Sequence, residues 1–140
     1  MELQTVLYEV ADGIAVVTLN RPEAMNAWTP QLSDELTIAM GMADTDDNVR
    51  VIVLTGAGKA FCAGADLSGG EDGFRGGEAS SYDGPRRWPH QTSKPVIAAI
   101  NGHAVGVGIT YPMLADIRIA SETAKIQYAM VRRGILPELG

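Results

Sequence analysis

The chain has 140 residues, 46% of them hydrophobic, which is the length and composition of one soluble globular domain. Its net charge of −6 argues against a general nucleic-acid-binding or anionic-membrane-binding surface, because either partner would be repelled at long range. A single cysteine and two histidines exclude an intramolecular disulfide and argue against a zinc site, and no apolar run approaches the roughly 20 residues of a membrane span, so we expect a cytoplasmic protein without a metal.

The first half of the chain predicts a strand, a helix and a second strand. Residues 13–19 carry β-branched side chains and then meet Asn20-Arg21-Pro22, which predicts a strand followed by a turn. Thr29-Pro30 supplies an N-cap and a first-turn proline, and apolar residues follow at helical spacing, which predicts a helix over residues 30–44. Residues 49–56 form an apolar run short enough for a buried strand. This order indicates a parallel crossover.

The second half continues the alternation of strands and helices. Residues 69–90 are rich in glycine and predict a variable, mobile surface loop, either a plain insertion or a substrate cover. A buried-strand pattern follows at residues 96–100, then a short helix over residues 108–115, a strand at residues 116–120 and a short strand at residues 124–129. The recurrence of these units favours a spiral α/β architecture. The chain ends at Gly140 without a final helix or capping signal, where we do not expect an intact domain to stop.

Two glycine-rich turns follow predicted buried strands. They are GKAFCAGADLSGG at residues 58–70 and NGHAVGVG at residues 101–108. Gly64 and its small neighbours allow a ligand close to main-chain N–H groups, and a helix starting near Asp66 would point its positive end the same way. Two such turns facing one cleft would form a two-donor site for an enolate or tetrahedral oxyanion. Ordinary turns are the alternative, whereas a phosphate loop is disfavoured because neither string matches G-x-x-x-x-G-K-[ST] or G-x-G-x-x-G.

Four segments carry a resemblance to a known family. NRPEAMNA at 20–27, GAGKAFCAGADL at 56–67, KPVIAAINGHAVGVG at 94–108 and ADIRIASETAKI at 115–126 occur in the order and spacing of the crotonase superfamily. The chain resembles an enoyl-CoA hydratase/isomerase family protein over nearly its whole length. The resemblance implies a ClpP-like crotonase spiral of β-β-α units. Residues 1–140 would be the N-terminal part of this single domain, truncated before the C-terminal helices that build homotrimers or dimers of trimers.

The resemblance also implies a ligand and a set of binding residues. The ligand is an acyl-CoA thioester, with coenzyme A entering as part of the substrate and no separate cofactor. The oxyanion donors would be the backbone N–H groups of Ala65 and Val107, although valine in place of the more usual glycine narrows the approach. The residues that match the CoA and adenine pocket are Met25, Ala27, Ala63, Asp66 and Leu67. Arg21 and Lys59 would be phosphate neighbours or solvated surface residues.

The residues at the family's catalytic positions differ from the usual hydratase pattern. Hydratases of this family use two glutamates, and these positions fall on Thr110 and Met130, neither of which can act as a carboxylate base. Glu138 matches the glutamate that shuttles a proton in 3-enoyl to 2-enoyl isomerases, and a carboxylate without a chemical role is an equally weighted alternative. Three functions stay open: an isomerase, a hydratase or other crotonase reaction using residues beyond Gly140, and a catalytically inactive truncated acyl-CoA-binding remnant.

Several polar residues near these motifs have ordinary structural interpretations. We expect His103 to be a packed or capping residue, Cys62 a small packing residue and Asp116 a structural polar residue. Arg132 and Arg133 would pair with CoA phosphates or a neighbouring subunit, or form an exposed cationic pair.

Overall fold

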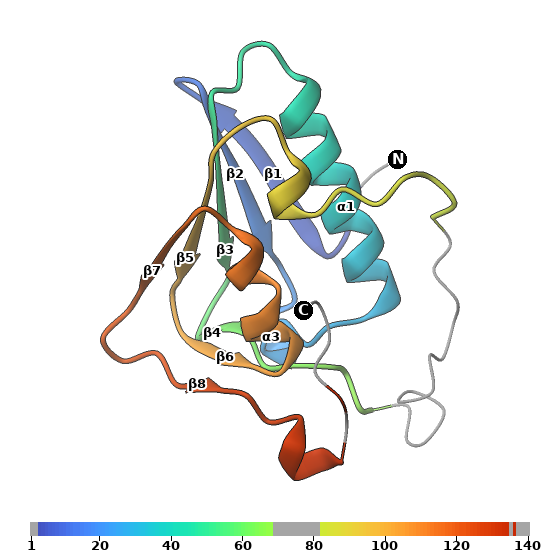
Figure 1. Ribbon diagram of the computed structural model, residues 1–140, viewed down its shortest axis with the longest axis vertical. Helices are drawn as coiled ribbons and strands as arrows, with labels where there is room; N and C mark the ends of the chain where they lie inside the picture. The colour runs from blue at the N-terminus through green and yellow to red at the C-terminus, as the bar shows by residue number, and fades with distance from the viewer. Residues whose placement is uncertain (1–2, 69–81, 135, 137–140) are drawn as a thin grey trace.

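The computed structural model describes residues 3–68, 82–134 and 136, and these form two sheets with helices beside them (Figure 1). The larger sheet has the order β1-β2-β3-β5-β7, and the smaller one has the order β4-β6-β8. The strands of the larger sheet are Val6–Ala11 (β1), Ile14–Leu19 (β2), Val51–Gly56 (β3), Val96–Ile100 (β5) and Ile117–Ala120 (β7). Those of the smaller sheet are Ala60–Cys62 (β4), His103–Val105 (β6) and Ile126–Gln127 (β8).

The strand pairings make a spiral. β1 and β2 form an antiparallel hairpin, and its turn residues Asp12 and Gly13 both have positive φ angles. β2 then pairs parallel with β3, which confirms the predicted crossover. From β3 onward the strands alternate between the two sheets: β3, β5 and β7 join the larger sheet, and β4, β6 and β8 join the smaller one. Each later strand pairs in parallel with the strand before it in its own sheet. This winding confirms the predicted spiral α/β architecture.

Helix α1, Pro30–Thr45, covers one face of the larger sheet (Figure 1). The side chain of Thr29 caps it by accepting a hydrogen bond from the Leu32 amide at 3.1 Å, as the Thr-Pro pair predicts. Leu32, Leu36 and Met40 lie at helical spacing and are fully or almost fully buried in the core. The Glu35 carboxylate, also buried, accepts backbone N–H groups from residues 4–6 and so fastens the start of β1 to this helix.

Two predicted helices differ from the structure. The segment 108–115 is divided into α3, Val107–Thr110, and a 3-10 turn, Pro112–Leu114, because Pro112 has no N–H to continue the α-helical pattern. A helix near Asp66 is not formed through Ser68, since the Asp66 amide instead donates to the Trp28 carbonyl in an extended bridge. Strands β4 and β6 were not predicted, because they are only three residues long and lie in glycine-rich segments. The six-residue strand β1 was also not predicted.

Part of the predicted mobile loop, residues 69–81, lies outside the described residues. The remainder is attached to the body of the protein. Arg86 and Arg87 form ion pairs with Asp34 and Asp44 of α1 at 2.9 and 3.5 Å. The ring of Trp88 packs on Tyr111 with centroids 5.9 Å apart, and Pro89 is buried. Residues 86–89 therefore bridge α1 and the segment after α3.

The outer edge of the spiral is apolar and exposed. All four residues of β7 are exposed, including Ile117 at 51% and Ile119 at 61%, and among the described residues β7 pairs with β5 alone. Ile126 and Tyr128 of the neighbouring β8 segment are also about half exposed. A further strand or a second polypeptide at this edge would bury these side chains. Within the described ranges, no helix is both long enough and apolar enough to cross a bilayer.

Candidate active site

The two glycine-rich turns pack backbone against backbone at one end of the smaller sheet. A Cβ atom on Gly108 would lie 2.1 Å from the carbonyl oxygen of Cys62, and one on Gly64 would lie 3.1 Å from that of Val105. These approaches require glycine, because a side chain would force the two segments apart. Since β4 and β6 are parallel, the segments that leave them carry Ala65 and Val107 to the same edge of this sheet.

The backbone N–H of Ala65 is directed away from its strand neighbour. Trp28 forms a parallel bridge with Ala65: the Trp28 amide donates to the Gly64 carbonyl at 2.8 Å, and the Asp66 amide donates to the Trp28 carbonyl at 2.9 Å. In such a pairing, the central residue turns its own N–H and C=O to the opposite side. No hydrogen bond recorded within the described residues uses the Ala65 N–H.

The backbone N–H of Val107 is also unused within residues 3–68, 82–134 and 136. Val107 is the first residue of α3, where an N–H group has no acceptor inside the helix. The preceding Gly106 has φ 56° and ψ −122°, a conformation open to glycine, and its carbonyl accepts the amides of Ile109 and Thr110. The Gly106 carbonyl is therefore used by α3, whereas the Val107 amide at the start of this helix has no acceptor in the described chain.

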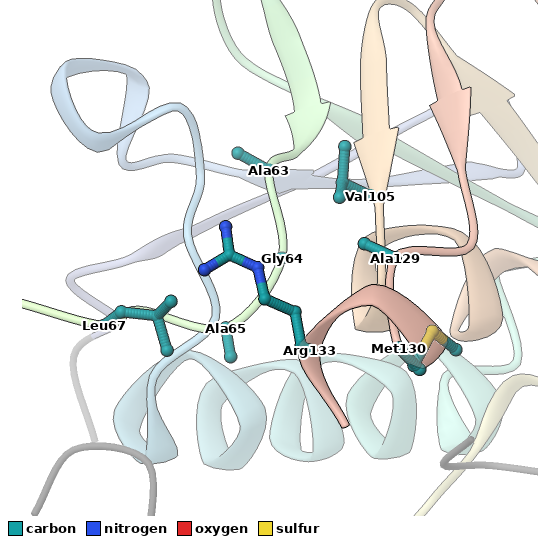
Figure 2. Close-up of a pocket in the computed structure, with 8 residues that line it drawn as sticks. All are labelled: Ala63, Gly64, Ala65, Leu67, Val105, Ala129, Met130 and Arg133. Atoms are coloured by element: carbon teal, nitrogen blue, oxygen red, sulfur yellow. The ribbon is translucent and has the colours of Figure 1, made fainter. Parts of the chain in front are cut away.

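A cavity of about 350 Å³ lies beside Ala65 (Figure 2). This volume is within the range of small-molecule sites. The described residues that line it are Ala63, Gly64, Ala65, Leu67, Val105, Ala129, Met130 and Arg133. They come from the turn after β4, from β6 and from the segment that follows β8, and all but Arg133 are small or apolar. The cavity is suited to an apolar ligand with one anionic or carbonyl group.

The structure brings together only some of the residues predicted for the site. Ala63, Ala65 and Leu67 line the cavity, whereas Val107 does not. The other predicted residues outside its lining are Met25, Ala27 and Asp66. Glu138 lies outside the described residues.

The two positions at which hydratases carry glutamate have different surroundings. Met130 lines the cavity and is 7% exposed, so a thioether and not a carboxylate lies in the cavity wall at this position. Thr110 is buried in α3, and its hydroxyl has no hydrogen-bond partner in the part of the chain that the structure describes. Neither side chain supplies a base to the cavity.

The turn over residues 20–27 is held to the Ala65 segment by an ion pair. The Arg21 guanidinium lies 3.0 Å from the Asp66 carboxylate, and it also donates to the carbonyl of Ala27. Hydrogen bonds from Ser68, together with the charge of Arg21, lower the pKa of Asp66. Asp66 is therefore ionised at neutral pH and already paired, so Arg21 is a protein-bound cation and not a freely solvated one.

Asn26 is the residue of this turn that sequence reasoning missed. It is fully buried with φ 55°, a backbone region that asparagine tolerates better than most residues. Its side-chain oxygen accepts the Arg21 amide, and its side-chain nitrogen donates to the carbonyls of Ala57 and Ala60, each at 2.8 Å. Asn26 thus fastens the turn to the segment that leads into β4. No local pattern marks this role in the sequence, because the two carbonyls lie 31 and 34 residues further along the chain.

Asn26→Ala is expected to lower the free energy of unfolding by about 2–4 kcal/mol, because it leaves two buried carbonyls and one amide without partners. Urea denaturation monitored by tryptophan fluorescence measures this change. Asn48→Ala is the matched control, since Asn48 is exposed, and should change stability by less than about 0.5 kcal/mol. Equal losses in the two variants would contradict a fastening role for Asn26.

The remaining polar residues near the cavity have structural roles or no partner. Burial raises the pKa of the Cys62 thiol to about 11, so Cys62 is a neutral packing residue, as expected. The Asp116 carboxylate accepts the Val96 amide at 2.8 Å, which confirms its structural role. His103 is half-buried in β6, and its Nδ1 atom has no hydrogen-bond partner among the described residues.

Comparisons with known proteins agree with this architecture. The family model for enoyl-CoA hydratase/isomerase matches residues 9–140. The chain is 46% identical over 132 residues to the enoyl-CoA hydratase ACTT3 of Alternaria alternata, covering 91% of this chain and 44% of that protein. It is 38% identical over 143 residues to a probable enoyl-CoA hydratase of Rhodobacter capsulatus, covering all of this chain and 55% of that protein.

A solved structure gives the same result for the fold. A probable enoyl-CoA hydratase/isomerase from Mycobacterium abscessus superposes with a TM-score of 0.83 at 40% identity, covering 96% of this chain and 52% of that one. The chain thus spans about half the length of the relatives it matches. The spiral of β-β-α units is the crotonase fold expected from the four sequence segments. By sequence and by fold, this chain belongs to the enoyl-CoA hydratase/isomerase family of the crotonase superfamily.

Proposed function

We propose that this chain binds an acyl-CoA thioester and polarises its carbonyl in the isomerisation of 3-enoyl-CoA to 2-enoyl-CoA. The observation that carries the proposal is the unused backbone N–H of Ala65. Ala65 lines an apolar cavity, and its N–H is turned away from Trp28 and forms no recorded hydrogen bond within the described residues. The Val107 N–H is the second proposed donor. Each such donor lowers the barrier by about 2.7–4 kcal/mol when it meets the developing oxyanion.

The proposed reaction needs one base and two hydrogen-bond donors. The base removes a proton from C2 of the 3-enoyl thioester, and the resulting dienolate places its negative charge on the thioester oxygen, where the amides stabilise it. The base then returns the proton to C4, which moves the double bond from C3–C4 to C2–C3. No water or redox partner is consumed, so a single carboxylate suffices.

Glu138 is the proposed base. Hydration would require one group to activate water and another to protonate the α-carbon, and Met130 and Thr110 stand where the family's hydratases have these carboxylates. Met130 lines the cavity without offering a proton acceptor. The absence of carboxylates at these two positions favours isomerisation over hydration.

Two alternatives follow from other observations. The relatives named enoyl-CoA hydratase favour hydration, or another crotonase reaction, using groups outside the described residues. The missing hydratase glutamates favour an inactive acyl-CoA-binding protein. In all three cases, coenzyme A arrives as part of the ligand and contacts the surface formed by Met25, Ala27, Ala63, Asp66 and Leu67. We further propose that the protein acts in the cytoplasm as a homo-oligomer.

The test is a pair of assays with the purified protein. Incubation with 3-hexenoyl-CoA should produce the conjugated 2-hexenoyl thioester, which is followed by its ultraviolet absorbance. Incubation with 2-hexenoyl-CoA should leave that absorbance nearly constant. Rapid loss of the conjugated thioester without isomerisation would establish the hydratase alternative. Binding of hexanoyl-CoA without either reaction would establish the inactive one.

A further inference from the structure

Arg133 is the charged residue in the lining of the apolar cavity. It ends the 3-10 turn η4, Val131–Arg133, which follows the segment after β8. Figure 2 shows its side chain reaching from this turn across the cavity toward Gly64 and Ala65. The seven other lining residues carry no charge, so the guanidinium is the only charged side chain among the described residues of the cavity wall.

Four other arginines of the described chain are held by the protein, whereas Arg133, like the exposed Arg50 and Arg132, has no recorded partner among the described residues. Arg21, Arg86 and Arg87 form ion pairs with aspartates, and Arg118 donates to backbone carbonyls. No carboxylate in the described ranges lies within ion-pair distance of Arg133, and no hydrogen bond from its side chain is recorded there. A cation that lines an apolar cavity and has no partner among the described residues is available to a ligand.

The charge of the whole protein strengthens this point. At a net charge of −6, the long-range field of the chain repels an anionic ligand, so binding of such a ligand requires a local cation at the site. A guanidinium binds a carboxylate through two parallel hydrogen bonds, which confers selectivity as well as affinity. Arg133 provides this local cation, because it lines the same cavity as Ala65.

We infer that Arg133 makes the site selective for acyl thioesters whose acyl group carries a second, terminal carboxylate. The inference rests on the proposed function, because it takes the Ala65 cavity as the place of the thioester. Arg133 lies three residues after Met130, and both line the cavity with Ala65, so the guanidinium faces the acyl part of the ligand. Arg133 is therefore a specificity-determining residue that leaves the proton transfer itself to the base.

The experiment compares two thioesters that have the same five-carbon chain and differ in the terminal carboxylate. Glutaryl-CoA and pentanoyl-CoA are titrated by calorimetry into the protein and into its Arg133→Gln variant. The unaltered protein should bind glutaryl-CoA about two- to fivefold more tightly, the range for an arginine–carboxylate pair at an exposed residue such as Arg133. Arg133→Gln should abolish this preference and leave the affinity for pentanoyl-CoA unchanged. Arg132→Gln, at an exposed residue outside the cavity lining, should keep the preference.

The other outcomes overturn the inference in distinguishable ways. Equal weakening of both thioesters by Arg133→Gln would mean that the guanidinium contacts the CoA phosphates. Equal affinities in the unaltered protein would remove the selectivity but leave acyl-CoA binding intact. Failure of both thioesters to bind would overturn the proposed function together with the inference, whereas selective binding without isomerisation of 3-hexenoyl-CoA would overturn the proposed reaction alone.

Discussion

Glu138→Gln is expected to slow the isomerisation of 3-hexenoyl-CoA by about 10²- to 10⁴-fold, the usual contribution of a positioned base. Glutamine has nearly the same size as glutamate, but its amide cannot take the proton from C2 and return it to C4. The affinity for hexanoyl-CoA should stay unchanged, since the proposed thioester contacts come from backbone amides. Initial rates from the rise in conjugated-thioester absorbance, with binding measured separately, give both quantities.

A second glutamate provides the control for this result. Glu122 is exposed in the turn between β7 and β8 and is not among the cavity-lining residues, so Glu122→Gln should leave the rate unchanged. Equal rates for Glu138→Gln and the unaltered protein would remove Glu138 from the mechanism. A fall in affinity that accounts for the whole loss of rate would give Glu138 a binding role instead.

Gly108→Ala is expected to have the largest effect on the arrangement of the site. The new methyl group would lie 2.1 Å from the Cys62 carbonyl oxygen and 2.8 Å from its carbon, and backbone atoms cannot yield as a flexible side chain does. The turn after β6 must therefore move away from β4 and carry the Val107 amide with it. We expect a loss of about 1–3 kcal/mol in the free energy of unfolding. Misplacement of one oxyanion donor should lower kcat by a further 10²- to 10³-fold, roughly.

The same substitution in helix α1 has the opposite expected sign. A Cβ atom on Gly41 would meet nothing within 4 Å, so Gly41→Ala should stabilise the protein by about 0.5–1 kcal/mol through helix propensity. Urea denaturation and an isomerisation assay on both variants separate the effect of the close backbone contact at Gly108 from the effect of a glycine-to-alanine change elsewhere in the protein. Full stability and activity in Gly108→Ala would show that the two turns do not depend on this close contact.

The sequence was sufficient for the longer elements because their signals are local. The Thr29-Pro30 cap and the helical spacing that follows it define α1 within one residue of its observed end. The apolar runs predicted at residues 49–56 and 96–100 contain β3 and β5, and the family segments were enough to predict the spiral. Short elements were missed for the same reason: β4 and β6 have three residues each, too few for a periodic pattern, and Pro112 divided a predicted helix.

The neighbours of each side chain depended on how distant segments pack. Arg21 and Asp66 are 45 residues apart and Asn26 reaches carbonyls more than 30 residues away, so neither the ion pair nor the anchoring role of Asn26 has a local signature. In the sequence, Arg133 has the ordinary features of an exposed cation. The structure shows that it lines the same cavity as Ala65. Composition, caps and hydrophobic period act over a few residues, whereas a cavity is formed where separate turns of the spiral meet. That is why the family and its glycine-rich turns could be predicted from the sequence, whereas only Ala63, Ala65 and Leu67 of the cavity lining were predicted.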